Sequence, residues 1–263
     1  MLNKPNNKLP FLPPDAEIES KEILRKAILA HKELAKLNGY CVTIPNDTIL
    51  LNTIILKEAQ ASSEIENIIT TQDELYKALA VENQRVDAST KEVLNYRESL
   101  WHGFHLLSQK GVLTTNVIVE IQKVLEKNDA GIRKVPGIAL VNDRTGETIY
   151  TPPDNYEKIL ELMKNLEGYI NIKDQTDPLI KMAVIHYQFE SIHPFYDGNG
   201  RTGRIINVLY LVLQNLIGKP ILYLSEYIIR NKGKYYQYLQ NVRTNGGCEK
   251  YILFMLEAVE QTS

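Results

Sequence analysis

Apolar residues recur every three or four positions through most of the chain, a spacing that places them on one face of an α-helix. Stretches with this spacing cover residues 16–39, 44–70, 91–111 and 114–128. Gly39 closes the first stretch, and glycine commonly follows the last turn of a helix. The pattern therefore predicts a mainly α-helical chain.

One segment departs from the helical spacing. Residues 138–141 and 148–151 are short β-prone runs on either side of the turn-forming sequence NDRTGE. Pro152 and Pro153 end the second run. A two-stranded ribbon is only marginally stable alone, so we expect this hairpin, residues 137–151, to lean on the helices or on a ligand.

Two further helices flank the stretch HPFYDGNGRTGR, residues 193–204. Asp177 and Pro178 have the residue types of a helix N-cap and first turn, and Pro194 ends that first helix. The second helix is expected over residues 201–218, closed by a glycine. The loop between them contains glycines that cost backbone entropy, which predicts a special backbone geometry and a bound ligand.

Composition and charge narrow the class of partner. The 263 residues contain 30 Lys and Arg against 32 Asp and Glu, a formal net charge of −2, so no overall basic field favours nucleic acid or an anionic membrane. The N-terminal residues lack an apolar signal core, and Cys41 and Cys248 have no metal-binding spacing. We therefore expect a cytoplasmic protein with no nucleic-acid or membrane partner.

The start of the second helix carries the strongest indication of a ligand. Arg201 and Arg204 lie where the helix dipole is positive, and a cation there is disfavoured by about 0.3 to 1 kcal/mol. The free amides of Gly198 and Gly200 add hydrogen-bond donors beside them. Together these groups predict a bound anion, for which polyphosphate is the natural candidate.

The neighbouring side chains suit phosphate chemistry. Asp197 offers an oxygen ligand for Mg²⁺, which binds proteins through few carboxylates together with substrate phosphates. Asn199 can donate to a phosphate oxygen, and His193 can take the proton of an attacking hydroxyl near neutral pH. His186 and Glu190, on the preceding helix, are expected to be structural. The loop thus predicts phosphate-ester transfer, although a simple surface turn would share its Gly, Asn and Asp residues.

The residues from His193 to Arg204 match HxFx(D/E)GNGRxxR, the signature of the Fic family, at every position, and the flanking sequence resembles bacterial Fic proteins over nearly the whole chain. The resemblance implies an all-α fold, a helical bundle with a small β-hairpin flap. It implies an autoinhibited protein adenylyltransferase that moves AMP from ATP to a Ser, Thr or Tyr hydroxyl of a target protein and releases pyrophosphate. The implied regions are an N-terminal helical region 1–90, a catalytic core 91–225 and C-terminal helices 226–263.

The same resemblance assigns roles to individual residues. His193 is implied as the general base and Asp197 as the Mg²⁺ ligand, with ATP as co-substrate. The flap at 137–151 is implied to align a target segment by strand pairing. Gly200 stands where the related Doc-type kinases carry lysine, which favours AMP transfer. The implied ATP-binding residues are Gly198, Asn199, Gly200, Arg201, Arg204, Tyr236 and Leu239, with the two arginines on the β- and γ-phosphates and the last two residues beside the base.

A second motif, [S/T]xxxE[G/N], occurs as Ser62, Glu66 and Asn67. A Ser and a Glu one helical turn apart usually form a solvated face. With a complete Fic signature downstream, however, the motif resembles the inhibitory helix of the family, here over about residues 53–69. Two alternatives stay open: removal of AMP from a modified target by the same site, and a nucleotide-binding interaction protein without catalysis. The expected partners are ATP and a target protein, and a homo-oligomer is compatible with the sequence.

Overall fold

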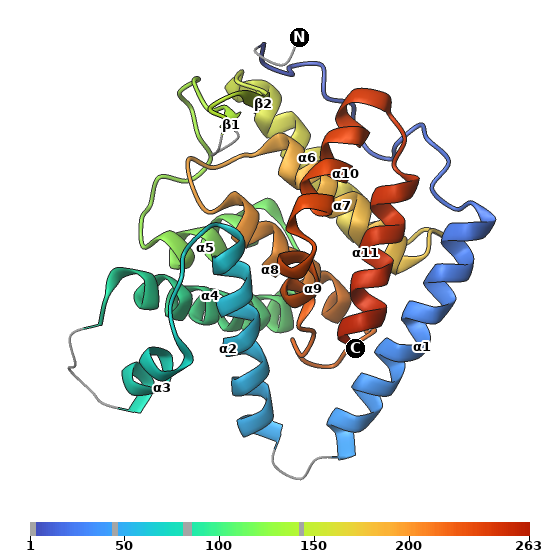
Figure 1. The fold of residues 1–263 in the computed structure, drawn as a ribbon. Helices are drawn as coiled ribbons and strands as arrows, with labels where there is room; N and C mark the ends of the chain where they lie inside the picture. The colour runs from blue at the N-terminus through green and yellow to red at the C-terminus, as the bar shows by residue number, and fades with distance from the viewer. Residues whose placement is uncertain (1–3, 44–46, 81–85, 142–144) are drawn as a thin grey trace.

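The structure, a computed structural model, describes residues 4–43, 47–80, 86–141 and 145–263. These residues form an all-α fold with one small antiparallel hairpin, as predicted (Figure 1). The elements in chain order are α1 (Lys21–Thr43), α2 (Asp47–Ile65), α3 (Gln72–Ala80), α4 (Ala88–Lys110), α5 (Thr115–Glu126), β1 (Leu140–Val141), β2 (Thr148–Tyr150), α6 (Tyr156–Asn171), α7 (Pro178–Ile192), α8 (Asn199–Leu213), α9 (Leu224–Arg230), α10 (Lys232–Asn245) and α11 (Glu249–Thr262).

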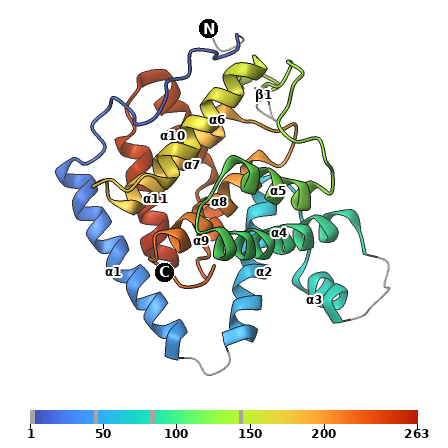
Figure 2. The same ribbon diagram turned by 180° about the vertical axis from the view of Figure 1, so that it is seen from behind.

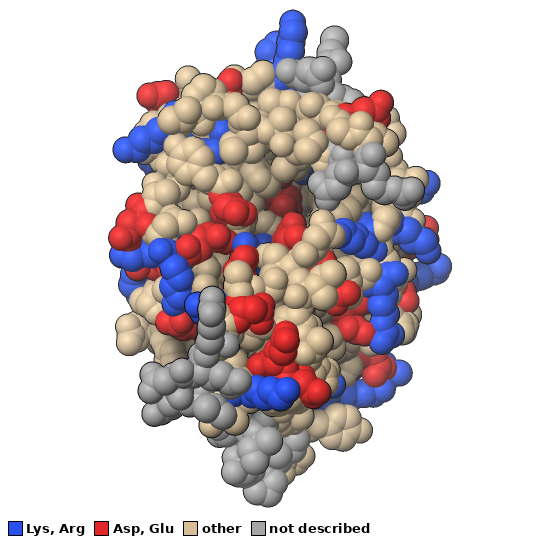
Figure 3. Space-filling view, turned by 60° about the vertical axis from the view of Figure 1, so that its left-hand side comes forward, with Lys and Arg blue, Asp and Glu red and all other residues tan. Residues whose placement is uncertain are grey.

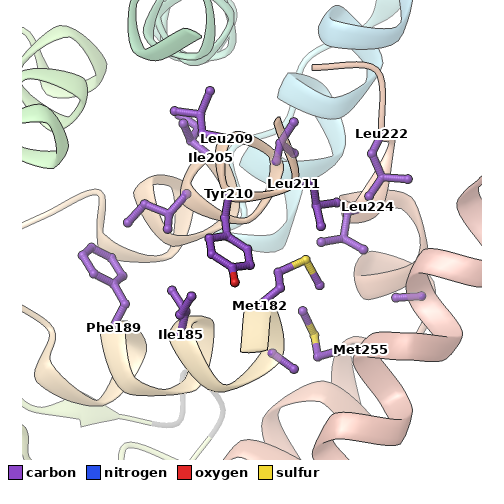
Figure 4. Close-up of a cluster of buried hydrophobic side chains, with 14 of the residues drawn as sticks. Met182, Ile185, Phe189, Ile205, Leu209, Tyr210, Leu211, Leu222, Leu224 and Met255 are labelled. Atoms are coloured by element: carbon purple, nitrogen blue, oxygen red, sulfur yellow. The ribbon is translucent and has the colours of Figure 1, made fainter. Parts of the chain in front are cut away.

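Helix α7 lies in the middle of the bundle, with 13 of its 15 residues buried. It packs against α8, α6, α11 and α1, so the two helices that flank the predicted ligand loop form the centre of the fold (Figures 1 and 2). In Figure 4 the Tyr210 side chain of α8 points toward Ile185 and Met182 of α7. Each fully buried apolar side chain contributes about 1.5 to 3 kcal/mol, which holds the loop between two rigid elements.

Helix α2 lies against α4 and α9, at the side of the bundle opposite α6 (Figures 1 and 2). Helices α4 and α5 pack on each other and on α8. Consequently α2, α4 and α5, all from the N-terminal half of the chain, bring their ends close to the N-terminal end of α8.

The two helix ends predicted at Gly39 and Gly218 are wrong. Helix α1 continues through Gly39 to Thr43, because its packing along α11 outweighs the cost of about 1 kcal/mol for a glycine inside a helix. Helix α8 ends at Leu213 and not at Gly218. Asn215 takes a left-handed conformation, φ 56°, which ends the helix before the glycine is reached, since Asn tolerates that conformation better than most residues.

The predicted hairpin exists and leans on the helical body. Residues 142–144 of its turn lie outside the described residues, and β1 and β2 pair in antiparallel orientation. Gln240 of α10 donates to the Ile149 carbonyl at 3.1 Å, and the Tyr150 hydroxyl donates to the Ser191 carbonyl at 2.8 Å. Within the described residues, no helix has the length and apolar character needed to cross a bilayer.

Candidate active site

His193 is the C-cap of α7. Its backbone is left-handed, φ 50° and ψ 60°, and its amide donates to the Phe189 carbonyl at 2.9 Å. Such a conformation is costly for a residue with a side chain and is typical of functional sites. Burial, with the guanidinium groups of Arg133 and Arg243, lowers the pKa of His193 to about 3. The imidazole is therefore neutral at neutral pH, the state that a proton acceptor requires.

The loop after His193 is held by its own residues. Phe195 is buried against Phe189, and the Asn199 side chain grips the Phe195 backbone, accepting from its amide and donating to its carbonyl, both at 2.9 Å. Asn199 thus uses both ends of its amide on the loop itself, and its phosphate contact stays a prediction. Gly198, with φ 75°, is the N-cap of α8, a conformation that glycine adopts without a steric cost.

Asp197 is the exposed carboxylate of the loop, and its Oδ1 accepts from the Gly198 amide at 2.6 Å. Among the described residues no group of three His, Cys, Asp or Glu side chains could hold a metal ion. A single exposed carboxylate next to the predicted phosphate site is the donor set that suits Mg²⁺ arriving with a nucleotide. The residues therefore fit the predicted ion.

Arg204 meets the second sequence motif. Its Nε donates to Ser62 Oγ at 2.7 Å, and its Nη2 donates to the Ser62 carbonyl at 2.9 Å and to Glu66 Oε1 at 2.7 Å. The Arg204 side chain is 1% exposed, whereas that of Glu66 is 35% exposed. The structure thus brings together two motifs that are far apart in sequence, and the Arg204 guanidinium already has an anionic partner.

Glu66 also stands over the loop. A Cβ at position 200 would collide with Glu66 Oε1, so the absence of a side chain at Gly200 is what lets the carboxylate approach. Glu66 lies just after α2, which ends at Ile65, and not inside a helix reaching residue 69 as expected. The reason is Asn67, whose left-handed φ of 63° turns the chain away after the last helical turn.

No local sequence pattern indicates the contact that fixes α2. Glu58, one turn before Ser62, is 1% exposed and accepts from the Ser225 amide at 2.9 Å, the Ser225 hydroxyl and the Tyr96 hydroxyl at 3.2 Å. Burial raises the pKa of Glu58, against these hydrogen bonds and the Arg204 charge. The buried carboxylate joins α2 to α9 and α4 and so fixes where Ser62 and Glu66 lie.

Arg201 is also paired, with two carboxylates that the sequence analysis missed. Its Nη1 donates to Glu92 of α4 and its Nη2 to Glu126 of α5, each at 2.9 Å, and its side chain is 3% exposed. The Glu126 carboxylate also sits against Gly198, where a Cβ would collide with it. Burial raises the pKa of Glu126, with Asp197 and Glu92 adding to the effect and Arg201 opposing it. The β-phosphate contact of Arg201 stays a prediction.

The remaining predicted residues lie on α7 and α10. His186 is structural: its ring bonds to the Tyr235 hydroxyl at 2.7 Å and the Asn207 amide at 3.1 Å. Glu190 is buried, and burial raises its pKa to about 7.

On α10, Tyr236 is 41% exposed and Leu239 is part of the core. Their contact with a nucleotide base stays a prediction.

Acidic side chains gather across the middle of the face shown in Figure 3, around a hollow, while Lys and Arg lie mostly at its margins. At the site itself, Arg201 and Arg204 are outnumbered by Glu66, Glu92 and Glu126. An anionic ligand therefore needs either a cation of its own or the departure of one of these carboxylates.

Two family models match the chain. The model described as Fic/DOC family N-terminal matches residues 24–105, and the model described as Fic/DOC family matches residues 112–211. The second match contains the loop from His193 to Arg204, and the first contains Ser62 and Glu66. Together the two matches include every residue of the two arginine contacts.

Curated relatives named protein adenylyltransferase Fic match part of the chain. The protein from Culex quinquefasciatus is 33% identical over 103 residues, which are 38% of this chain and 19% of that protein. The protein from Drosophila ananassae is 29% identical over 115 residues, 43% of this chain and 22% of the relative. The chain thus aligns with about a fifth of the length of these relatives.

Solved structures show the same fold. A crystal structure of a Fic family protein from Desulfovibrio desulfuricans superposes with a TM-score of 0.76 at 21% identity, covering 95% of this chain and 74% of that one. Residues 134–508 of Fic-1 from C. elegans with the change E274G give a TM-score of 0.68 at 20% identity, covering 91% and 70%.

Proposed function

The chain belongs to the Fic/DOC family, and on this premise we propose that it is a protein adenylyltransferase. In the proposed reaction the hydroxyl oxygen of a Ser, Thr or Tyr in a target protein attacks the α-phosphorus of ATP. The bond from that phosphorus to the bridging oxygen breaks, and pyrophosphate leaves with the electron pair. The support is the matched Fic domain together with relatives named protein adenylyltransferase Fic.

The observation that carries the proposal is a neutral imidazole at the start of a loop that runs into a helix N-terminus with two arginines. His193 accepts the proton of the target hydroxyl as the new oxygen–phosphorus bond forms. Its pKa of about 3 belongs to the site without nucleotide. The negative phosphates of ATP favour the charged imidazolium, so nucleotide binding raises this pKa and makes His193 a stronger base.

Asp197 is proposed to hold Mg²⁺ that arrives with ATP. When bound, the ion neutralises charge on the phosphates of the leaving group. The free amides at the start of α8 and the helix dipole favour the same phosphates. Asp197→Ala should weaken Mg²⁺-dependent ATP binding and abolish turnover, and wild-type activity that persists in excess EDTA contradicts the role.

Arg204 is proposed to hold the γ-phosphate only after Glu66 has left it. While Ser62 and Glu66 occupy its guanidinium, ATP is held with its α-phosphate misdirected relative to His193. A charge-assisted Arg–carboxylate hydrogen bond is among the stronger ones in proteins, so this contact is an effective block. Lys232 Nζ donates to Asn67 Oδ1 at 3.0 Å, an exposed hydrogen bond that favours the turn that carries Glu66. The enzyme is therefore autoinhibited in the described conformation.

The hairpin is proposed to present the target. On β2 the Ile149 carbonyl already accepts from Gln240, so the outer edge of β1 is the one proposed to pair with an extended segment of another protein. Val141 on β1 is 50% exposed and offers an apolar contact to such a segment.

Position-specific labels on ATP test the proposed reaction. Glu66→Gly protein is incubated with Mg²⁺, cell lysate and ATP labelled at either the α- or the γ-phosphate, followed by mass spectrometry of the labelled proteins. Relative to the same lysate with the Glu66→Gly/His193→Ala protein, AMP transfer predicts additional protein-bound label from the α-position alone and an added mass of one AMP. Additional label from the γ-position indicates phosphate transfer instead, and no additional label from either position rejects the proposal.

The exposed carboxylate of Glu66 favours a second candidate, removal of AMP from a modified target, because a carboxylate beside the α-phosphate can position a water molecule. Wild-type protein and Glu66→Gln are each mixed with a target that already carries labelled AMP. Release of AMP by wild type alone supports removal, and equal absence of release leaves transfer as the activity of this site.

A further inference from the structure

The backbone around His193 is bonded to the hairpin side of the molecule at four successive carbonyls. The Ser191 carbonyl accepts from the Tyr150 hydroxyl of β2. The next three accept from Arg133: Nη2 reaches the Ile192 carbonyl at 3.4 Å, Nε the His193 carbonyl at 2.8 Å, and the Arg133 amide the Pro194 carbonyl at 2.9 Å. The carbonyls at a helix C-terminus have no partners within the helix, so these bonds supply what α7 lacks.

Arg133 lies outside every helix and strand, between α5 and β1, yet it is 1% exposed and among the largest fully buried side chains. Its Nη2 also donates to the Pro153 carbonyl, just after β2. One guanidinium thus touches both the loop that starts at His193 and the base of the hairpin. The planar fork of arginine can serve such divergent carbonyls at once, whereas a lysine ammonium is a single point.

We propose that Arg133 is a positioning residue for the proposed reaction, which holds the left-handed backbone of His193 and joins it to the hairpin. His193 and the strands of the hairpin then keep a fixed relative position. A target segment bound to the hairpin therefore lies at a fixed distance from the imidazole. The roles of His193 as base and of the hairpin as target-binding element rest on the proposed function. The junction between the two rests on the hydrogen bonds of Arg133 alone.

The charge of Arg133 acts on the same imidazole. After burial, Arg133 and then Arg243 of α10 lower the pKa of His193, while a bond to the Glu190 backbone raises it. Tyr150 of β2 is the titratable group that the hairpin brings to this region, and its hydroxyl is committed to the Ser191 carbonyl. Loss of the Arg133 charge therefore raises the pKa of His193.

A matched control separates positioning from stability. Lys181 is 2% exposed and, like Arg133, is a buried cation that caps the end of a helix, donating to the Ile172 carbonyl and to Asp174 Oδ2, both at 2.9 Å. It lies in the first turn of α7, at the opposite end from His193. Arg133→Met, Arg133→Lys and Lys181→Met are made in the Glu66→Gly protein, and urea unfolding gives the folded fraction of each.

For Arg133→Met we expect kcat for AMP transfer to fall about 100-fold with the KM for ATP within about threefold, since small misplacement of a catalytic group has effects of that size. The acid limb of the kcat/KM profile moves to higher pH. Arg133→Lys keeps the positive charge, so the acid limb of the kcat/KM profile stays at the same pH. Its kcat falls about tenfold because the planar guanidinium that contacts several carbonyls is lost. Lys181→Met is less stable but keeps kcat and the limb. If kcat falls in both Met variants only in proportion to the folded fraction of each protein, the proposal is overturned.

Hydrogen exchange tests the junction without reference to activity. Backbone amides of residues 148–151, 191–193 and 195 are followed by mass spectrometry in each protein, because the prolines at 152, 153 and 194 have no amide hydrogen. Faster exchange of both segments in Arg133→Met, and of neither in Lys181→Met, supports the junction; unchanged exchange in Arg133→Met overturns it. A Glu66→Gly parent that transfers no AMP rejects the proposed function, while the exchange result still decides whether Arg133 joins the two segments.

Discussion

Arg201 and Arg204 lie three residues apart on α8, and both are buried and paired with carboxylates, yet their partners differ in kind. Glu92 and Glu126, which hold Arg201, belong to α4 and α5, and these two helices pack on each other and on α8. Glu66, which holds Arg204, lies after the last turn of α2 and is 35% exposed.

The two arginines differ in how easily their carboxylate contacts can separate. Glu66 can leave Arg204 by a change in the short turn at Asn67, while α2 stays fixed by the buried Glu58. Glu126 sits at the end of α5 with its side chain 12% exposed, so freeing Arg201 requires a shift in the core. We therefore expect the Glu66 contact to regulate activity and the Glu126 contact to maintain the fold.

The contrast between the Arg201 and Arg204 contacts concerns AMP transfer only if the reaction depends on His193. In the Glu66→Gly protein, His193→Ala should lower AMP incorporation by about 10² to 10⁴, because a lost general base has effects of that size. ATP affinity, measured by calorimetry, should stay within a few fold, since the base acts on the hydroxyl. If the Glu66→Gly/His193→Ala protein incorporates as much labelled AMP as Glu66→Gly, His193 is not the base and the two arginines take part in a different reaction.

Release of Arg204 gives the next largest effect. Glu66→Gly should raise AMP transfer, including modification of the protein itself, by about 5- to 150-fold, the range of a coupling of 1 to 3 kcal/mol. Stability should fall by only about 1 kcal/mol, because Glu66 lies after the end of α2 and its side chain is 35% exposed, so water screens much of the ion pair that is lost. The measurement is incorporation of labelled AMP at equal protein and Mg²⁺–ATP. Equal incorporation by wild type and Glu66→Gly rules out the autoinhibitory contact.

The same kind of change at the other arginine should affect stability instead. Glu126→Gln keeps an oxygen acceptor for the buried Arg201 but leaves Glu92, whose side chain is 41% exposed, as the remaining carboxylate of the pair, so the free energy of unfolding should fall by about 1.5 to 3 kcal/mol. AMP transfer per folded molecule should match that of wild type. Glu120→Gln, an exposed acid on the same helix, is the control for the loss of one negative charge.

An activation by Glu126→Gln as large as that by Glu66→Gly contradicts this division. In that case Glu126 is a second internal anion, which the β-phosphate must displace from Arg201. Urea unfolding and labelled AMP incorporation on the same preparations distinguish the two outcomes.

The sequence predicts the central helices and the hairpin because their signals are local. Asp177 caps α7 and Pro178 follows it, as the residue types indicate, and apolar periodicity marks α8. That Ser62 and Glu66 belong to an inhibitory helix is expected only from the family resemblance. Spacing along a helix says which face is buried but not which distant element covers it.

The same limit explains the residues that were missed. Glu58, Glu92 and Glu126 lie within helical patterns where an acid usually marks a solvated face, and their partners are 167, 109 and 75 residues away. Arg133 lies in a stretch without periodicity, so nothing local indicates a buried guanidinium. A carboxylate or guanidinium is assigned a partner only when the fold is known.

The smallest expected effect concerns Ser62. Its hydroxyl accepts from Arg204 Nε at 2.7 Å, but Ser62→Ala leaves the Ser62 carbonyl and Glu66 in contact with the guanidinium. Loss of one hydrogen bond of about 1 kcal/mol in the locked state should raise AMP transfer about fivefold, less than Glu66→Gly does.

Ser63 provides the control for this change. It is fully buried on the same helical turn, and within the described residues its hydroxyl has no hydrogen-bond partner. Ser63→Ala should therefore keep AMP transfer within about twofold of wild type, because no bond to Arg204 is lost. If both alanine variants activate equally, the cause is a general loosening of α2. If Ser62→Ala activates more than Glu66→Gly, the hydroxyl and not the carboxylate holds Arg204 away from the nucleotide.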